Sequence, residues 1–299
     1  MESIAKLREI CQSSRVVVGD DFLLNFYFKL SIYFTWCCLK MKMSANQVTV
    51  LSGSFAIAGG LMISSDSKWI VLLGAICFPI FEILDCSDGE VARYRKQGGV
   101  TGHYLDWYMH FVSSTALMIG LFLASREHFQ STWLLLIGLL AIVNPILDKT
   151  ITNAGWTVIC WTRLGDINNN NIGPCDKNAE EIGKIQQKSW LYRRLRFLII
   201  SPLQDRWCAF IVFLLASLDL LFYLTRIEIF DFRFPLLAYI GVIGTINLYI
   251  RVRNMVKTKA LQAGYRRLFC PDEPLKLPKD ASKEDIAANS LKLTKDYFL

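Results

Sequence analysis

The sequence predicts an all-α polytopic membrane protein with six transmembrane helices and an N-terminal interfacial amphipathic helix. Of its 299 residues, 53% are hydrophobic, and the mean hydropathy is +0.32. Apolar runs long enough to cross a bilayer as helices, which takes about 20 residues, recur along the chain. Basic residues fall between these runs instead of forming one tract with interleaved aromatic residues, which argues against a nucleic-acid partner and favours the lipid bilayer.

The N-terminal segment is expected to lie outside the membrane core. Residues 1–20 are polar and charged, which predicts a short cytoplasmic helix and no cleavable signal peptide. Residues 21–42 are apolar and aromatic but are interrupted by Asn25, Lys29 and Lys40. Such a composition is typical of a helix that lies in the membrane interface. A seventh crossing over the same residues is the competing interpretation.

Six apolar segments follow, and Ser44 or Asn46 is expected to cap the first of them. Within this segment, small residues recur at i,i+4 spacing and would let another helix approach closely; they are Ser52, Ala56 and Gly60. The expected spans are residues 48–64, 69–84, 102–124, 132–151, 206–224 and 234–250.

Three aspartates and one histidine lie where the second span ends and the third begins. Asp85 and Asp88 are separated by i,i+3, and Asp106 and His110 by i,i+4, so each pair shares one face of its helix. A short turn joins the two spans, so both faces reach the same side of the membrane. Hard divalent cations bind oxygen clusters of this kind, and carboxylates at the membrane edge are costly unless neutralised. The pattern therefore predicts a metal site at the membrane interface.

These residues resemble the signature of the CDP-alcohol phosphotransferase family, membrane enzymes of phospholipid biosynthesis. Seven of the eight fixed positions match at the right spacings, in Asp85-x2-Asp88-Gly89-x2-Ala92-Arg93-x8-Gly102-x3-Asp106. A second family element ahead of the first span is similar to Asn46-Gln47-Val48-Thr49, with Ala45 where proline is usual.

The resemblance implies a transferase that moves a phospho-alcohol or phosphatidyl group from a CDP-linked donor to a hydroxyl acceptor, either a small polar alcohol or a lipid, and releases CMP. It implies dependence on Mg²⁺ or Mn²⁺ and a homodimer. It divides the chain into a cytoplasmic lead with a juxtamembrane helix at residues 1–45, a six-span catalytic domain at 46–260 and a charged tail at 261–299. Carried over by position, the metal ligands are Asp85, Asp88 and Asp106, and the nucleotide contacts are Asn46, Thr49, Gly89, Ala92, Arg93 and Gly102.

The chain departs from the family at the eighth position, where His110 replaces a fourth aspartate. The resemblance gives that aspartate a metal contact and the deprotonation of the acceptor alcohol. His110 is therefore either a general base that acts with Asp106, since an imidazole is a well-matched proton acceptor near neutral pH, or a metal ligand that moves the preference toward Mn²⁺. A third interpretation is a catalytically impaired family member.

Two further interpretations stay open. A transporter or a structural membrane protein with an acidic ion site is the alternative from another class, although it predicts charges spread through several spans near the midplane. Outside the motif, Arg206 at the start of the fifth span is a candidate for phosphate contact, and Glu82 is expected to orient Arg93 or the metal, or to serve helix packing.

The distribution of basic residues predicts the orientation. Of the 33 Lys and Arg residues, 29 lie before the first span, in the turn at residues 93–101, between residues 149 and 206, or after residue 250. Because positive residues accumulate in cytoplasmic loops, both termini and the acidic motif are predicted to be cytoplasmic.

A single cysteine placed at position 128 of a cysteine-free variant should react only with a reagent added outside the cell. Reaction from the cytoplasmic side would contradict the orientation.

Overall fold

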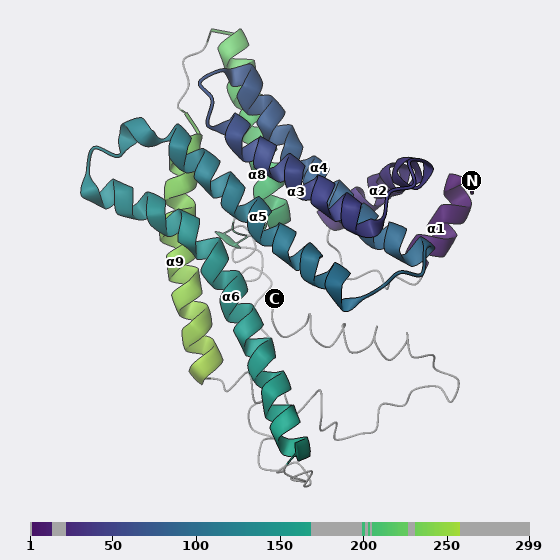
Figure 1. Ribbon diagram of the computed structural model, residues 1–299. Coiled ribbons are helices and arrows are strands. Elements are labelled where there is room, and N and C mark those ends of the chain that lie inside the picture. Colours follow the sequence, from purple (N-terminus) through teal and green to yellow (C-terminus); the bar gives the residue numbers. More distant parts are fainter. Residues whose placement is uncertain are drawn as a thin grey trace. The chain divides into compact units, whose positions relative to one another are not determined.

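The computed structural model describes residues 2–13, 22–168, 199–200, 203, 205–226 and 231–257, and every regular element in these ranges is helical (Figure 1). The chain divides into two compact units, one of Met1–Ile146 with Arg194–Thr245 and one of Leu147–Arg193 with Ile246–Leu299. The helices are α1 (Ile4–Gln12), α2 (Phe22–Lys40), α3 (Ala45–Ile63), α4 (Lys68–Tyr94), α5 (Val100–Ala124), the short 3-10 helix η1 (Arg126–His128), α6 (Thr132–Asn168), α8 (Asp205–Leu224) and α9 (Arg233–Lys257).

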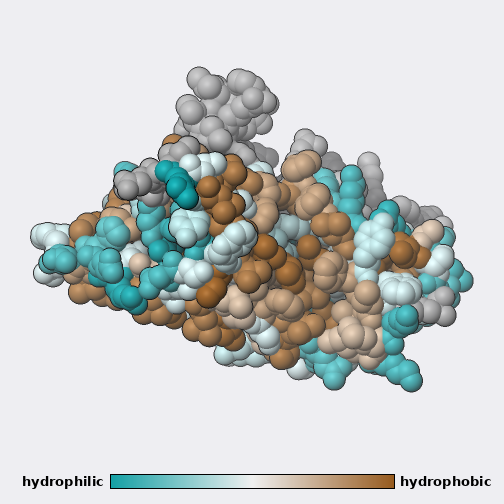
Figure 2. Space-filling model, turned by 90° about the horizontal axis from the view of Figure 1, so that it is seen from above, coloured by the Kyte–Doolittle hydropathy of each residue, from teal (hydrophilic) through white to brown (hydrophobic). Residues whose placement is uncertain are grey.

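Seven of the described helices are long and apolar enough to cross a membrane, so the predicted class of integral membrane protein is confirmed. The count exceeds the predicted six by α2, the segment for which an interfacial position is expected. Figure 1 shows α2 nearly end-on, whereas α3, α4 and α5 run across the view. This crossing orientation fits a helix that lies along the membrane surface. Figure 2 shows wide areas of exposed hydrophobic residues, as expected for a surface that faces lipid.

The ends of α3 and α4 follow from local sequence. Ser44 caps α3: its Oγ accepts a hydrogen bond from the backbone N–H of Gln47, and the Gln47 side chain accepts one from the Ser44 N–H. Of the two predicted caps, the structure therefore selects Ser44. Helix α4 runs unbroken from Lys68 through the internal Pro79 to Tyr94. The acidic motif is thus the last part of a membrane helix and not a loop.

Helix α3 packs against both α4 and α5, and glycines set the closeness of these contacts. A Cβ at Gly59 would meet the backbone carbonyl of Gly74 on α4 at 2.9 Å. A Cβ at Gly60 would collide with the backbone of Ala116 on α5, and one at Gly120 would collide with Gly60. The predicted small-residue stripe that ends at Gly60 therefore serves packing inside the chain, and the homodimer stays a prediction without support from this stripe.

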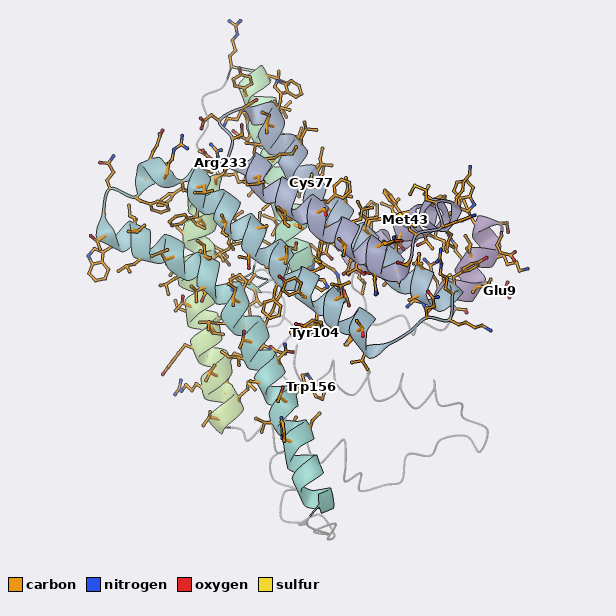
Figure 3. The ribbon with its side chains drawn as sticks, in the orientation of Figure 1. Glu9, Met43, Cys77, Tyr104, Trp156 and Arg233 are labelled. Carbon is orange, nitrogen blue, oxygen red and sulfur yellow. The ribbon has the colours of Figure 1, made fainter. Side chains whose placement is uncertain are left out.

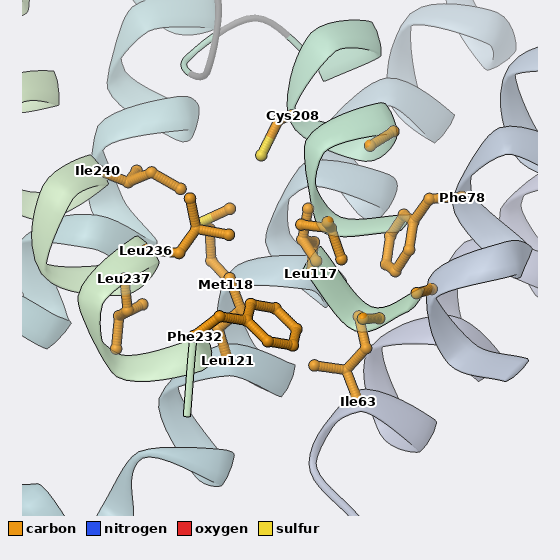
Figure 4. Packing of buried hydrophobic residues seen from close by; sticks show 14 of the residues in the cluster. Ile63, Phe78, Leu117, Met118, Leu121, Cys208, Phe232, Leu236, Leu237 and Ile240 are labelled. Carbon is orange, nitrogen blue, oxygen red and sulfur yellow. The ribbon is translucent and has the colours of Figure 1, made fainter. Parts of the chain in front are cut away.

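A large apolar core joins α3, α4, α5, α6, α8 and α9 within the first unit (Figure 4). Phe78 of α4 and Leu121 of α5 are almost fully buried there, together with Leu237 of α9. A buried Asn144 on α6 donates hydrogen bonds to the backbone carbonyls of Ile240 and Gly241 on α9. The core holds the helices that carry the acidic motif against the remaining spans.

A group of charged residues stabilises the end of α3 and α4 that lies farthest from the acidic motif. Lys68 pairs with Asp219 at 2.8 Å, and Arg233 donates to the carbonyl oxygen of Ser65 at 2.7 Å. Burial opposes ionisation of Asp231, but hydrogen bonds from Arg233 outweigh it and lower the pKa of this carboxyl group. Figure 3 shows Arg233 and Met43 at opposite ends of the α3–α4 pair.

In the second unit, the structure describes the C-terminal parts of α6 and α9. Helix α6 continues past residue 151, where the fourth span was predicted to end, and includes the apolar run up to Trp161. Asp148 of α6 forms an ion pair with Arg251 of α9. The basic cluster Arg193, Arg194 and Arg196 and the tail at 261–299 lie outside the described residues.

The glycine contacts predict that two glycine-to-alanine substitutions on α3 lower the stability of the fold by different amounts. Gly60→Ala should lower the stability of the fold by about 1–3 kcal/mol, because its methyl group would meet backbone that cannot move aside. Gly53→Ala is the matched control, since its methyl group would meet only the flexible Met109 side chain. Thermal unfolding in detergent micelles should show a clear loss for Gly60→Ala and a small one for Gly53→Ala. Equal losses would contradict the close α3–α5 contact.

Candidate functional site

Three of the four predicted metal ligands converge where α4 ends and α5 begins. The Nε2 atom of His110 lies 3.2 Å from Oδ1 of Asp85 and 3.7 Å from Oδ1 of Asp106. One potential ligand atom from each of these residues lies within 4.8 Å of the other two. The two aspartates come from different helices, so the convergence is a property of the fold and not of sequence spacing alone.

This donor set fits a divalent cation. Two carboxylate oxygens and one imidazole nitrogen are ligands for Mg²⁺ and Mn²⁺. Ligands of a bound Mg²⁺ lie roughly 3–4 Å apart, because each bond is about 2.1 Å long, so only slight contraction of the cluster is needed. Phe81 contacts the imidazole edge-to-face, with ring centroids 5.5 Å apart, and helps to fix the plane of His110. All three side chains are partly exposed, so a cation and a substrate can reach them.

Asp88 lies beside this group but is held by a different partner. Its Oδ2 accepts a hydrogen bond of 2.6 Å from the hydroxyl of Thr49 on α3, and both residues are buried. Asp88 is not among the three residues whose ligand atoms converge, so its role as a metal ligand stays a prediction. Thr49 orients a motif carboxylate in this structure, and its contact with the nucleotide stays a prediction.

Two of the predicted nucleotide contacts come from different helices and lie side by side. A Cβ on Gly102 would lie 3.5 Å from Oδ1 of Asn46, so the two predicted nucleotide contacts are neighbours although 56 positions separate them. Gly89 and Ala92 lie on α4 and are partly exposed. Gly89 and Ala92 themselves carry little or no side chain, as the predicted nucleotide site requires.

Arg93 is directed differently from the expectation. Its Nε donates a hydrogen bond of 2.7 Å to the backbone carbonyl of Cys11 on α1. This places part of the guanidinium group against the N-terminal helix, which the sequence treated as a separate cytoplasmic lead. Phosphate contact by Arg93 stays a prediction.

Arg206 and Glu82 add a charged pair next to the cluster. Nε of Arg206 donates to Oε2 of Glu82 at 3.1 Å, so Glu82 pairs with Arg206 and not with Arg93. Glu82 is 1% exposed, whereas the Arg206 side chain is 35% exposed. Glu82 lies one helical turn before Asp85 on α4, which places the pair beside the cluster. A buried carboxylate thus holds a cation at the edge of the predicted metal site.

Comparison with known families agrees with this geometry. Residues 42–167 match the family model described as CDP-alcohol phosphatidyltransferase. Residues 42–167 thus resemble the domain of this family. A ceramide phosphoethanolamine synthase from Drosophila melanogaster is 32% identical over 84 residues, which are 26% of this chain and 21% of that relative. The matched part therefore spans about a fifth of the relative, and the domain match covers α3, α4, α5 and most of α6.

The hydrogen bond between Thr49 and Asp88 predicts a specific loss. Thr49→Val should destabilise the protein by about 1–3 kcal/mol, because it leaves a buried carboxylate oxygen without its donor. Thr49→Ser retains the hydroxyl and should lose much less. Ser52→Ala is the matched control, since the Ser52 hydroxyl bonds only to a carbonyl of its own helix. Thermal unfolding that ranks Thr49→Val no lower than Ser52→Ala would contradict the role of Thr49.

Proposed function

We propose that the protein transfers a phospho-alcohol group from a CDP-alcohol to a hydroxyl acceptor and releases CMP. The family to which the matched domain belongs implies transfer of a phospho-alcohol from a CDP-alcohol. The observation that carries the proposal for this chain is the convergence of Asp85, Asp106 and His110 at the junction of α4 and α5. A transporter would need charges along a path through the bilayer, whereas these groups form one cluster at the ends of two helices.

In the proposed reaction the acceptor oxygen attacks the phosphorus that carries the alcohol. The bond from this phosphorus to the bridging oxygen breaks, and CMP leaves with the bridging oxygen and its electron pair. The acceptor hydroxyl loses its proton to a base in the site. A divalent cation held by Asp85, Asp106 and His110 would neutralise the pyrophosphate and the charge that develops on it.

Arg206 supplies the second positive charge of the proposed site. Glu82 holds its Nε, and the Arg206 side chain is 35% exposed, so a phosphate can approach it. A planar guanidinium group suits the non-bridging oxygens of a phosphate. We therefore assign Arg206, already a candidate for phosphate contact from its sequence position, to the pyrophosphate of the donor.

For His110, the geometry favours a metal ligand over a general base. Its Nε2 lies near an oxygen of each aspartate, at the position proposed for the cation. The ligand role would favour Mn²⁺ more than an all-carboxylate site would. Asp106, the most exposed of the three side chains, is then the candidate base for the acceptor proton.

The activity of the relative suggests the first substrates to test. That protein is a ceramide phosphoethanolamine synthase, which points to CDP-ethanolamine as donor and ceramide as acceptor. Diacylglycerol and free inositol are the contrasting acceptors, one a lipid and one a small polar alcohol. The cytoplasmic position of the site and the homodimer remain proposals that rest on charge distribution and on the family resemblance.

The function is tested by CMP release from purified protein in lipid nanodiscs. A panel of CDP-alcohols and acceptors is supplied with Mn²⁺, with Mg²⁺ or with a chelator. We expect release with at least one donor–acceptor pair, abolished by the chelator and reduced at least 100-fold in Asp85→Asn, because that change removes a charged ligand. Asp66→Asn, an exposed acidic residue at the other end of α4, should behave as wild type. Absence of CMP release across the panel would contradict the proposal.

Substitution of His110 separates its two roles. If His110 is a ligand, His110→Ala should weaken nucleotide affinity and turnover together, since the pyrophosphate binds through the metal. His110→Asp should regain most of the turnover and move the preference from Mn²⁺ toward Mg²⁺. Turnover and nucleotide binding are measured separately, by CMP release and by titration. Loss of turnover with intact affinity in both variants would show that the imidazole is the base.

A further inference from the structure

Glu90 belongs to the acidic motif, yet neither the metal cluster nor the nucleotide edge uses it. Its side chain is 0% exposed, and its carboxylate accepts three hydrogen bonds from two other helices. Ser31 and Thr35 of α2 donate at 2.7 and 2.6 Å, and Gln12 of α1 donates at 2.8 Å. A buried carboxylate is therefore fully engaged on the side of α4 that faces the N-terminal helices.

Glu90 lies on the back of the helix that carries the site. Glu90 comes two positions after Asp88, which corresponds to a rotation of about 160° around an α-helix. It comes five positions after Asp85, which corresponds to about 140°. Ser87 lies on this back face as well, and its hydroxyl donates to the carbonyl oxygen of Ser31 at 3.1 Å. Any rotation of α4 that moves the front aspartates must break these contacts.

The contacts between Glu90 and helices α1 and α2 are polar, although an uncharged side chain would be enough to pack these helices together. Burial of a carboxylate is costly, and an apolar side chain of similar volume often packs as well or better. Short directional hydrogen bonds, in contrast, specify one rotation and one height of α4 relative to α2. The donors come from α1 and α2, which lie outside residues 42–167 that match the family model. We call the hydrogen bonds from Gln12, Ser31 and Thr35 to Glu90 the brace. Its donors thus belong to parts of this chain beyond the matched segment.

We propose that Glu90 is a positioning residue, which with Ser31, Thr35 and Gln12 fixes the rotation of α4 and so the placement of Asp85 and Asp88. The expected effect on CMP release rests on the proposed function. The expected effect on metal binding depends only on the placement of the aspartates. Helices α1 and α2 are then part of the active-site scaffold and more than a membrane anchor.

The test measures Mn²⁺ affinity by electron paramagnetic resonance on the full-length protein in nanodiscs without substrate, beside thermal unfolding and CMP release. Glu90→Gln preserves the shape but places an amide N–H₂ either against the hydroxyl of Thr35 or against the hydroxyl of Ser31 and the amide of Gln12, all of which donate to the carboxylate. The double variant Ser31→Ala with Thr35→Val removes donors from α2 and leaves α4 unaltered, so it keeps the test valid if Glu90→Gln does not fold. Asp219→Asn is the control, because it breaks another buried charge contact at the far end of α4.

Both brace variants should weaken Mn²⁺ binding at least tenfold and slow CMP release. Asp219→Asn should lower the unfolding temperature to a similar extent while Mn²⁺ affinity stays within twofold of wild type. A brace variant that folds and binds Mn²⁺ as wild type does, whatever its unfolding temperature, would overturn the positioning role. Absence of CMP release by wild-type protein that still binds Mn²⁺ would overturn the proposed reaction instead, so the two failures are distinct.

Discussion

The contact between His110 and two aspartates is the interaction on which the organisation of the site depends. Asp85 and Asp106 lie on different membrane helices, and their charges repel when no positive group lies between them. In a membrane such charges are tolerated only with partners. The imidazole nitrogen lies within 3.2 and 3.7 Å of the two carboxylates, and Arg206 adds a positive charge held by Glu82. A divalent cation in the same position would satisfy the same requirement more strongly.

The helices around this contact are arranged so that α4 and α5 can present their acidic faces to each other. Helix α3 packs against both, through Gly59 on the α4 side and Gly60 on the α5 side. Thr49, on the same helix, orients Asp88 from the site end. Buried charges around Arg233 fix the opposite end. The placement of the motif thus depends on contacts along the whole length of α3.

Local features of the site could be predicted from the sequence because they depend on helical periodicity. The i,i+3 and i,i+4 spacings place each pair of motif residues on one face of its helix. The short turn between the two spans brings Asp85, Asp106 and His110 together. The capping box at Ser44 is equally local. The membrane class follows from composition, since spans of sufficient length are visible in the sequence.

Features that depend on partners far apart in the chain could not be predicted in this way. Glu90 meets Ser31 and Gln12 across 59 and 78 positions, and no periodic pattern links them. Arg93 was expected to face the nucleotide, but its Nε bonds to α1. The small-residue stripe on α3 was compatible with packing inside the chain or between chains, and only the backbone of α5 against Gly60 decides this.

The central claim is that carboxylates from α4 and α5 and the imidazole of His110 bind one metal ion. It is tested most directly by pulsed electron paramagnetic resonance of Mn²⁺ bound to protein whose histidines are labelled with ¹⁵N. The account predicts a hyperfine coupling to one ¹⁵N nucleus that disappears in His110→Asp while Mn²⁺ stays bound. Bound Mn²⁺ without a histidine coupling in the wild-type protein, or a coupling that persists in His110→Asp, would contradict it.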